Sequence, residues 1–178
     1  YTDNGIPWLT PADLRGYKDK YISHGNRFIT ELGLQKSSAR MLPKGSVLFS
    51  SRAPIGYVVI NNEELCTNQG FKSIVPYMIE MNEYIYYFLK HNTKNIEDMA
   101  SGTTFKEISG KGMSEIVIPV PQLEEQKRIV DKIDVLFKLI DKLDNNKQDL
   151  SKNISNTRNK VLQLAIKGKL VPQNESDE

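Results

Sequence analysis

Apolar residues in the last third of the chain recur with the period of a coiled-coil helix. From Gln122 to Lys167 there is no proline or glycine, and apolar residues repeat every seven positions in two series offset by four. This spacing matches the a and d positions of a heptad. The predicted seam consists of Ile129, Ile133, Leu136, Ile140, Leu143, Leu150, Ile154, Val161 and Leu164. The pattern predicts one long helix, which Gly168 and Pro172 bring to an end.

The predicted helix needs a partner for its seam. At 1.5 Å per residue it is roughly 65–70 Å long, about twice the diameter of a globular domain of ~120 residues. The alternative is a helix that folds back on itself, for which Asn145–Asn146, followed by Lys147 at an a position, is the weakest point. In the first turns of the helix the apolar face is wider, because Val135, Phe137 and Leu139 are added to it. The globular part or a second partner is expected to pack there.

The residues before Pro121 show a different pattern, in which glycine and proline punctuate short apolar runs. Such runs are typical of strands and loops. The expected elements are a turn at 43–45, strands at 47–49, 57–60, 71–75 and 116–120, and a short helix at 84–90. The predicted fold class is therefore α+β: a mixed globular domain over residues 1–121, a long coiled-coil helix over 122–168 and a polar tail over 169–178.

Composition narrows the class of protein. The chain has 178 residues, of which 39% are hydrophobic and 26% charged, as in ordinary soluble proteins. No run approaches the ~18 apolar residues of a membrane-spanning helix. The single cysteine, Cys66, excludes an intrachain disulfide, and the two histidines, His24 and His91, lie far apart. We therefore expect a reduced, cytoplasmic location, no membrane association and no metal site.

The charge of the chain is unevenly distributed. Residues 1–60 contain eight Lys or Arg and four acids, a net +4, whereas residues 61–115 carry −3 and residues 116–178 carry +1. A basic N-terminal part suits contact with phosphates. A simply solvated surface also accounts for this balance.

Catalytic motifs are missing from the sequence. Seven residues separate Gly102 from the Gly110–Lys111 pair, and Gly112 follows, whereas a P-loop has four residues there and then Ser or Thr. There is no dinucleotide-binding G-x-G-x-x-G and no Asn-Pro-Pro-Tyr type tetrapeptide of an adenine methyltransferase. No acid pair of the kind that holds Mg²⁺ in nucleases stands out. We therefore expect no catalysis by this chain and no cofactor bound to it.

Five motifs in order resemble one family. They are Ile6–Asp13 (IPWLTPAD), Gly45–Gly56 (GSVLFSSRAPIG), Thr67–Phe71 (TNQGF), Ser101–Thr104 (SGTT) and Ile118–Gln126 (IPVPQLEEQ), with the long helix after them. Together they resemble the specificity (S) subunit of type I restriction-modification enzymes over nearly the whole chain.

The resemblance implies a target recognition domain that reads one half of a bipartite sequence in double-stranded DNA. It also implies a helix that pairs antiparallel with that of a second recognition unit, or of a second copy, and so fixes the gap between half-sites. Methyltransferase (M) and restriction (R) subunits would be the partners, and S-adenosylmethionine, ATP and Mg²⁺ would bind to them.

This chain departs from the family pattern in two respects. It holds one recognition domain where a full-length S subunit carries two. The family also usually has some tens of residues before the Pro-Trp motif. We therefore expect the chain to be part of a longer one: the second half of a full subunit, a half-sized subunit or an isolated fragment.

Candidate DNA-binding residues lie in polar, basic turns and loops. An arginine in a rigid turn, such as Arg52, can donate two bonds to guanine or contact a phosphate, although it can equally form a structural ion pair. The amides of Asn68 and Gln69 suit adenine, although they can equally close a turn beside Gly70. Trp8 is expected in the core. The full set is Arg15, Lys18, Lys20, Lys36, Ser38, Arg40, Ser51, Arg52, Asn68, Gln69, Thr103, Thr104 and Lys106.

Two other functions compete with a type I specificity subunit. One is the recognition domain of a fused type II methyltransferase–nuclease, with catalytic motifs elsewhere in the gene product. The other is a coiled-coil scaffold that binds only protein.

Overall fold

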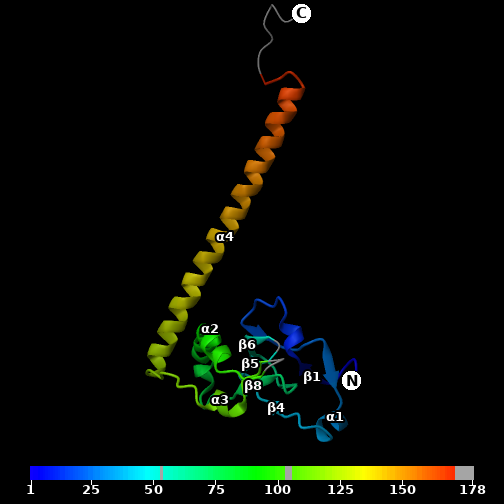
Figure 1. The fold of residues 1–178 in the computed structure, drawn as a ribbon, viewed down its shortest axis with the longest axis vertical. Helices are drawn as coiled ribbons and strands as arrows, with labels where there is room; N and C mark the ends of the chain where they lie inside the picture. Colours follow the sequence, from blue (N-terminus) through cyan, green and yellow to red (C-terminus); the bar gives the residue numbers. More distant parts are fainter. Residues whose placement is uncertain (53, 103–105, 171–178) are drawn as a thin grey trace, which may run out of the picture. The chain divides into compact units, whose positions relative to one another are not determined.

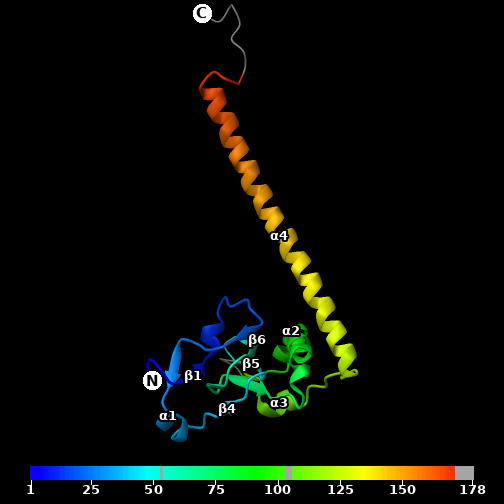
Figure 2. The ribbon, with the colours of Figure 1, turned by 180° about the vertical axis from the view of Figure 1, so that it is seen from behind.

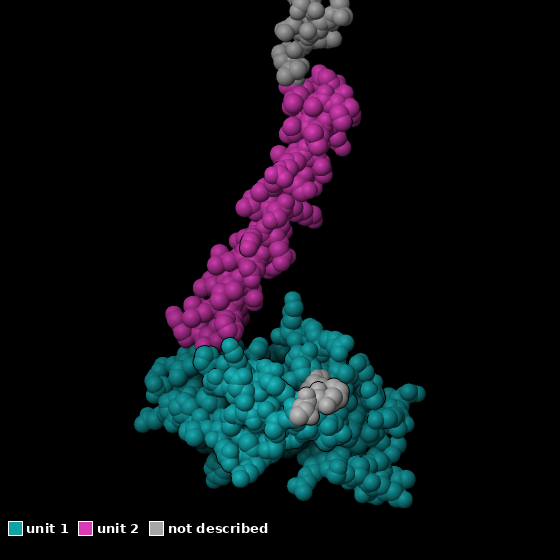
Figure 3. Space-filling model, viewed as in Figure 1, with its two compact units in different colours: residues 1–130 teal, residues 131–178 magenta. Residues whose placement is uncertain are grey.

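The computed structural model describes residues 1–52, 54–102 and 106–170. The chain forms two compact units, Tyr1–Val130 and Asp131–Glu178, which are coloured separately in Figure 3. The division lies inside the long helix, beyond the expected boundary at residue 121. The first turns of that helix therefore pack with the globular unit.

Two four-stranded sheets form the globular unit (Figure 1). In the first sheet, β1 (Ile6–Leu9) is antiparallel to β3 (Arg27–Ile29) and parallel to β7 (Leu65–Thr67), and β7 is antiparallel to β4 (Met41–Leu42). In the second, β5 (Val47–Ser51) is antiparallel to both β6 (Ile55–Asn61) and β8 (Phe71–Ile74), and β6 is parallel to β2 (Tyr21–Ile22). The predicted strands at 47–49, 57–60 and 71–75 are β5, β6 and β8, of which β8 ends one residue earlier than expected.

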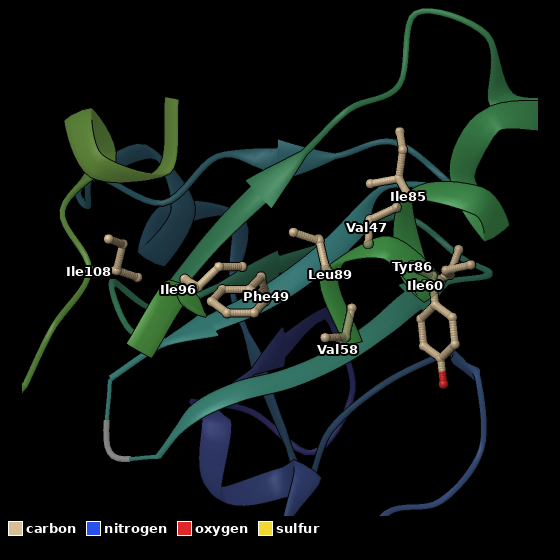
Figure 4. Packing of buried hydrophobic residues seen from close by; sticks show 9 residues of the cluster. All are labelled: Val47, Phe49, Val58, Ile60, Ile85, Tyr86, Leu89, Ile96 and Ile108. Carbon is tan, nitrogen blue, oxygen red and sulfur yellow. The ribbon is translucent and has the colours of Figure 1, made fainter. Parts of the chain in front are cut away.

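The second sheet separates two hydrophobic cores because side chains alternate along a strand. Val47 and Phe49 of β5 contribute to one core, whereas Leu48 between them contributes to the other. Figure 4 shows the first core, which is completed by Val58, Ile60, Ile85, Tyr86, Leu89, Ile96 and Ile108. The second core consists of Leu9, Leu14, Ile22, Leu48, Val59, Leu65 and Phe71.

Short helices complete the globular unit. They are the 3₁₀ helices η1 (Pro11–Leu14) and η2 (Ile79–Met81) and the α-helices α1 (Glu31–Gln35), α2 (Asn82–Asp98) and α3 (Gly110–Ser114). The helix predicted at 84–90 lies in the first half of α2, which begins two residues earlier and continues to Asp98, where Ile96 extends the buried face. Figures 1 and 2 show α2 and α3 near each other, with β1 and α1 at the other side of the unit.

The strand predicted at 116–120 is wrong. These residues connect α3 to α4 without a strand partner in the described chain. Pro119 and Pro121 have no N–H to donate to a ladder, and the carbonyl of Pro119 accepts a 2.8 Å hydrogen bond from Tyr84 Oη. A short run of β-branched residues, which is typical of strands, therefore belongs here to a connecting segment.

The predicted long helix is confirmed as α4 (Leu123–Ile166), which has 44 residues and is about 66 Å long. Glu124 and Glu125 occupy its first turn, where the helix dipole favours acids. Gly168 has a φ of 63°, and the N–H of Lys169 reaches back to the Leu164 carbonyl at 2.8 Å. This left-handed cap ends the helix where the sequence predicts.

The predicted seam of α4 is largely uncovered within this chain. Leu143 and Leu150 are 67% and 61% exposed. The other exposed residues of the seam are Leu136, Ile140, Ile154 and Val161. Ile129, Ile133 and Leu164 are half-buried. No described helix is long and apolar enough to cross a membrane.

Candidate nucleic-acid interface

Two adjoining hollows share Trp8 in their wall. Trp8 lies in β1, where its Cα is paired with that of Arg27 in β3 and that of Cys66 in β7. The hollows have volumes of about 430 and 270 Å³, and Asn68 and Gln69 line both of them. Their lining residues, here called the Trp8 surface, are Tyr1, Trp8, Thr10–Ala12, Arg27, Ser37–Arg40, Leu42, Arg52 and Thr67–Gly70.

Backbone hydrogen bonds hold the segments of this surface together. The N–H of Asn68 donates to the carbonyl of Leu9 at 3.1 Å, which joins the 68–70 turn to the end of β1. The N–H of Ser51 donates to the carbonyl of Gly70 at 2.8 Å, which joins the same turn to the end of β5. Trp8, Asn68 and Arg52 are therefore fixed by main-chain bonds between segments far apart in sequence.

Arg52 is placed by an irregularity in the β5–β6 hairpin. The register shifts between Phe49 and Ser51, and the hydroxyl of Ser50 stabilises this shift by donating to the Pro54 carbonyl and accepting from the Tyr57 N–H, both at 2.8 Å. Arg52 then lines the first hollow, with Nη1 lying 3.9 Å from a carboxylate oxygen of Glu107. The structural ion pair that the sequence left open for Arg52 is therefore present, with Glu107 as its partner, although the distance is long.

Asn68 has a divided role. Its side-chain oxygen accepts a 2.9 Å hydrogen bond from the Gly70 N–H. Asn68 therefore closes the turn, which was one of the two roles considered for it from the sequence. Its side-chain NH₂ makes no hydrogen bond to the described residues, and the residue lines both hollows. Because the oxygen is already engaged, the amide is better suited to donate than to pair with both edge groups of adenine.

The Trp8 surface is positively charged. Among the described residues that line the two hollows there are three arginines, Arg27, Arg40 and Arg52, and no aspartate or glutamate. Guanidinium groups bind phosphate oxygens and guanine edges through two parallel N–H bonds. The hydroxyl of Ser38 and the amides of Asn68 and Gln69 add further hydrogen-bond donors to this surface.

Two of the predicted DNA-binding residues have structural surroundings instead. Ser51 is fully buried, so its side chain cannot reach a ligand at the surface. Lys20 forms a 2.9 Å ion pair with Glu83 and lies over the ring of Tyr87, 4.8 Å from its centroid. Tyr21 also donates its hydroxyl to Glu83. Lys20 therefore holds the β2 segment against α2.

The remaining candidates are exposed but scattered. Arg15, Lys18, Lys36 and Lys106 are exposed and line neither hollow. Lys36 precedes Ser37 directly and so lies beside the second hollow, whereas Lys18 lines a separate, smaller hollow with Tyr86 and Lys90. Thr103 and Thr104 lie outside the described residues.

Two residues of the surface were missed from the sequence. Arg27 was not singled out, and Trp8 was expected in the core but is only partly buried. Both depend on the pairing of β1 between β3 and β7, which short apolar runs do not reveal. The one available signal was Trp8 within the Pro-Trp motif.

A hydrogen-bonded aspartate holds the segment after β1. Asp13 Oδ2 accepts from the Thr10 N–H and hydroxyl at 2.8 and 2.7 Å, and Oδ1 accepts from the Asn26 side-chain amide at 2.8 Å. Burial by itself would raise the pKa of the Asp13 carboxyl, but the hydrogen bonds from Thr10 and Asn26 outweigh it and lower that pKa. Asp13 is therefore a structural carboxylate. The described residues contain no cluster of His, Cys, Asp and Glu suited to a metal ion.

Comparisons with known proteins agree on one family. Residues 1–154 match the family model of the type I restriction modification DNA specificity domain. The chain is 43% identical over 143 residues to the type I restriction enzyme MjaIX specificity subunit of Methanocaldococcus jannaschii, covering 79% of this chain and 33% of that protein. It is 28% identical over 141 residues to the Escherichia coli EcoR124I/EcoR124II specificity subunit, covering 75% and 34%. The chain thus spans about a third of the length of these relatives.

Solved structures share the fold. The HsdS subunit of Thermoanaerobacter tengcongensis has a TM-score of 0.67 at 22% identity, with 96% of this chain and 39% of that chain covered. A chain from a structure described as the basis of complex assembly and conformational transition of the type I R-M system has a TM-score of 0.73 at 24% identity, covering 94% and 40%. The match of residues 1–154 to the family model and the 43% identity to the M. jannaschii subunit show that the chain belongs to the family of type I restriction-modification DNA specificity domains.

Proposed function

We propose that this chain recognises one half of a bipartite DNA target for a type I restriction-modification enzyme and has no catalytic activity of its own. The observation that carries this proposal is the Trp8 surface, where Arg27, Arg40, Arg52 and two amides meet around one tryptophan without a carboxylate in the described lining. Such a surface suits phosphates and base edges, and membership of the specificity-domain family supports the same role.

The catalytic steps then belong to partner subunits. Methyltransferase subunits would supply S-adenosylmethionine-dependent methylation, and restriction subunits would use ATP and Mg²⁺. The seam of α4 would pair antiparallel with a second recognition unit, or with a second copy, and the helix length would set the distance between half-sites. Calorimetric titration of the pure chain with S-adenosylmethionine is expected to give no saturable signal.

Binding to a fluorescent random-sequence duplex at 50 and 200 mM salt tests the proposal. Nonspecific binding with a Kd of about 10⁻⁴–10⁻⁶ M is expected, and it should weaken steeply with salt because counterions are released from the DNA. Absence of salt-dependent binding would favour a scaffold that binds only protein.

A matched pair of substitutions tests the location of the site. Arg40→Ala is expected to lower the affinity and to reduce the salt slope by about one unit. Arg15→Ala makes the same chemical change at an exposed arginine outside the Trp8 surface, and it should have a smaller effect. If the two substitutions had equal effects, the Trp8 surface would not be the DNA-binding site.

A further inference from the structure

One carboxylate, that of Glu107, lies between two cations beside the Trp8 surface. Lys72 Nζ is 3.1 Å from Oε1 of Glu107, and Arg52 Nη1 is 3.9 Å from Oε2. The three side chains are 25–39% exposed, so the cluster is in contact with solvent. Arg52 is also a wall of the first hollow.

We propose that Glu107 is a positioning residue that makes this surface discriminate between DNA sequences. It would hold the guanidinium of Arg52 at the hollow and oppose the binding of phosphate there. The proposal rests on the proposed function in DNA recognition, because it assigns a role to Glu107 in that same site.

The main chain fixes Glu107 firmly in place. Glu107 and Ser101 exchange backbone hydrogen bonds of 3.0 and 3.2 Å, and the next N–H, that of Ile108, donates to the Ser51 carbonyl at 3.0 Å. Arg52 and Glu107 themselves form an isolated antiparallel bridge. The carboxylate and the guanidinium therefore start from backbone positions tied to each other.

Lys72 leaves one carboxylate oxygen for Arg52. It donates a hydrogen bond to Oε1, whereas the 3.9 Å from Arg52 to Oε2 is too long for a hydrogen bond. Arg52 is attracted and oriented, yet its N–H donors make no hydrogen bond within the described residues. A guanidinium oriented in this way can still donate two bonds to a guanine edge.

The carboxylate affects the two kinds of DNA group differently. A phosphate carries a full negative charge, so it is repelled by Glu107 and must compete with it for Arg52 and Lys72. A base edge is neutral and meets much less repulsion. Specificity is a difference between affinities, so a carboxylate that weakens phosphate binding more than base binding raises the preference for the target sequence.

The experiment compares Glu107→Gln with Glu115→Gln. Both substitutions remove one negative charge, but Glu115 pairs with Lys111 at 4.0 Å, both side chains being mostly exposed, and it lines neither hollow of the Trp8 surface. The affinity for a random-sequence duplex is measured from 50 to 300 mM salt. Glu107→Gln is expected to bind about tenfold more tightly than the parent, with a salt slope steeper by about 0.9 because one more phosphate is neutralised.

Four further results are expected on this view. Glu115→Gln should tighten binding much less, and Glu107→Asp, which keeps the charge, should stay close to the parent. Selection from a random duplex pool should recover a weaker consensus with Glu107→Gln than with the parent. Adding Arg52→Ala to Glu107→Gln should remove most of the gain in affinity.

The outcomes separate this inference from the proposed function. If the parent binds DNA but Glu107→Gln and Glu115→Gln behave alike, only net charge matters and the role of Glu107 is refuted. A lower melting temperature for Glu107→Gln, with weaker DNA binding, would make the residue structural and also refute it. If neither the parent nor any variant binds the duplex at low salt, the proposed function and the inference fail together.

Discussion

Ser51 and Arg52 are neighbours at the end of β5 that have opposite surroundings. Ser51 is fully buried, whereas Arg52 is partly exposed and lines a hollow. Side chains alternate between faces along a strand, but the register shift between Phe49 and Ser51 interrupts the alternation. The sequence therefore identifies the turn that contributes to the site but not which of its side chains reaches solvent.

Ser51→Ala is expected to leave DNA binding unchanged. The hydroxyl of Ser51 is buried and has no hydrogen-bond partner among the described residues, so its removal relieves an unsatisfied polar atom. The free energy of unfolding, measured by chemical denaturation, should stay equal or rise by up to about 1 kcal/mol. If Ser51→Ala lowered the affinity for DNA while the fold stayed unchanged, Ser51 would contribute to DNA binding after all.

Trp8→Ala is expected to weaken DNA binding by about 1–2 kcal/mol, because an apolar wall that can contact a base or sugar is lost. Trp8→Phe keeps an aromatic wall and should lose less. Affinity is measured at a temperature where circular dichroism shows all forms folded. If Trp8→Ala and the parent bind alike while the melting temperature falls, Trp8 has only the core role that the sequence suggested.

At the scale of elements, η1 depends on one ionised carboxylate. The lowered pKa of Asp13 means that the folded state holds this proton less tightly than the unfolded state does. Its stabilisation is therefore complete above the unfolded pKa of about 3.8 and is lost as the pH falls through the lower, folded pKa.

Asp13→Asn is expected to cost about 1 kcal/mol of stability at neutral pH, as the loss of a helix cap does. Below about pH 4 the parent should lose stability as Asp13 is protonated, and the variant should lose less because it has no carboxyl at this position. Thermal unfolding between pH 2.5 and 7 measures both effects. Asp3→Asn, at an exposed position, is the control, and an equal pH profile for the two variants would contradict the role of Asp13.

Long patterns were predictable and short ones were not. The heptads of α4 repeat often enough to identify a helix, and β5 and β6 are runs of five and seven residues. β8 was also predicted, although it has only four residues. The strands β1, β2, β3, β4 and β7 have two to four residues, too few to show a period, and their order depends on contacts between distant segments. Arg52 and Asn68 could be named in advance, but their meeting at Trp8 follows from the pairing of β1 with β7.

At the scale of the whole molecule, the dominant feature is the uncovered seam of α4. Burying one large aliphatic side chain contributes about 1.5–3 kcal/mol, so leaving the whole seam in water would cost on the order of ten kcal/mol. The exposed Leu143 and Leu150 carry part of this cost within a single chain. A second helix is therefore expected to cover the seam.

Leu143→Asp is expected to abolish self-association of the chain. Sedimentation equilibrium at micromolar concentration should give a dimer for the parent and a monomer for this variant. Asn145→Asp places the same charge at the outward f position of the heptad and should leave the dimer intact. A parent that is strictly monomeric, with Leu143→Asp equally stable, would mean that the helix pairs only with another protein.

Five polar residues of the Trp8 surface lie outside both cores, which has a consequence for engineering. Ser38, Arg40, Arg52, Asn68 and Gln69 belong to neither core, and main-chain bonds rather than these side chains hold most of their segments in place. A combinatorial library that randomises these positions, except for the turn-closing Asn68, would therefore vary what the protein reads while both cores stay intact. The fold then acts as a fixed frame on which new recognition sequences can be selected.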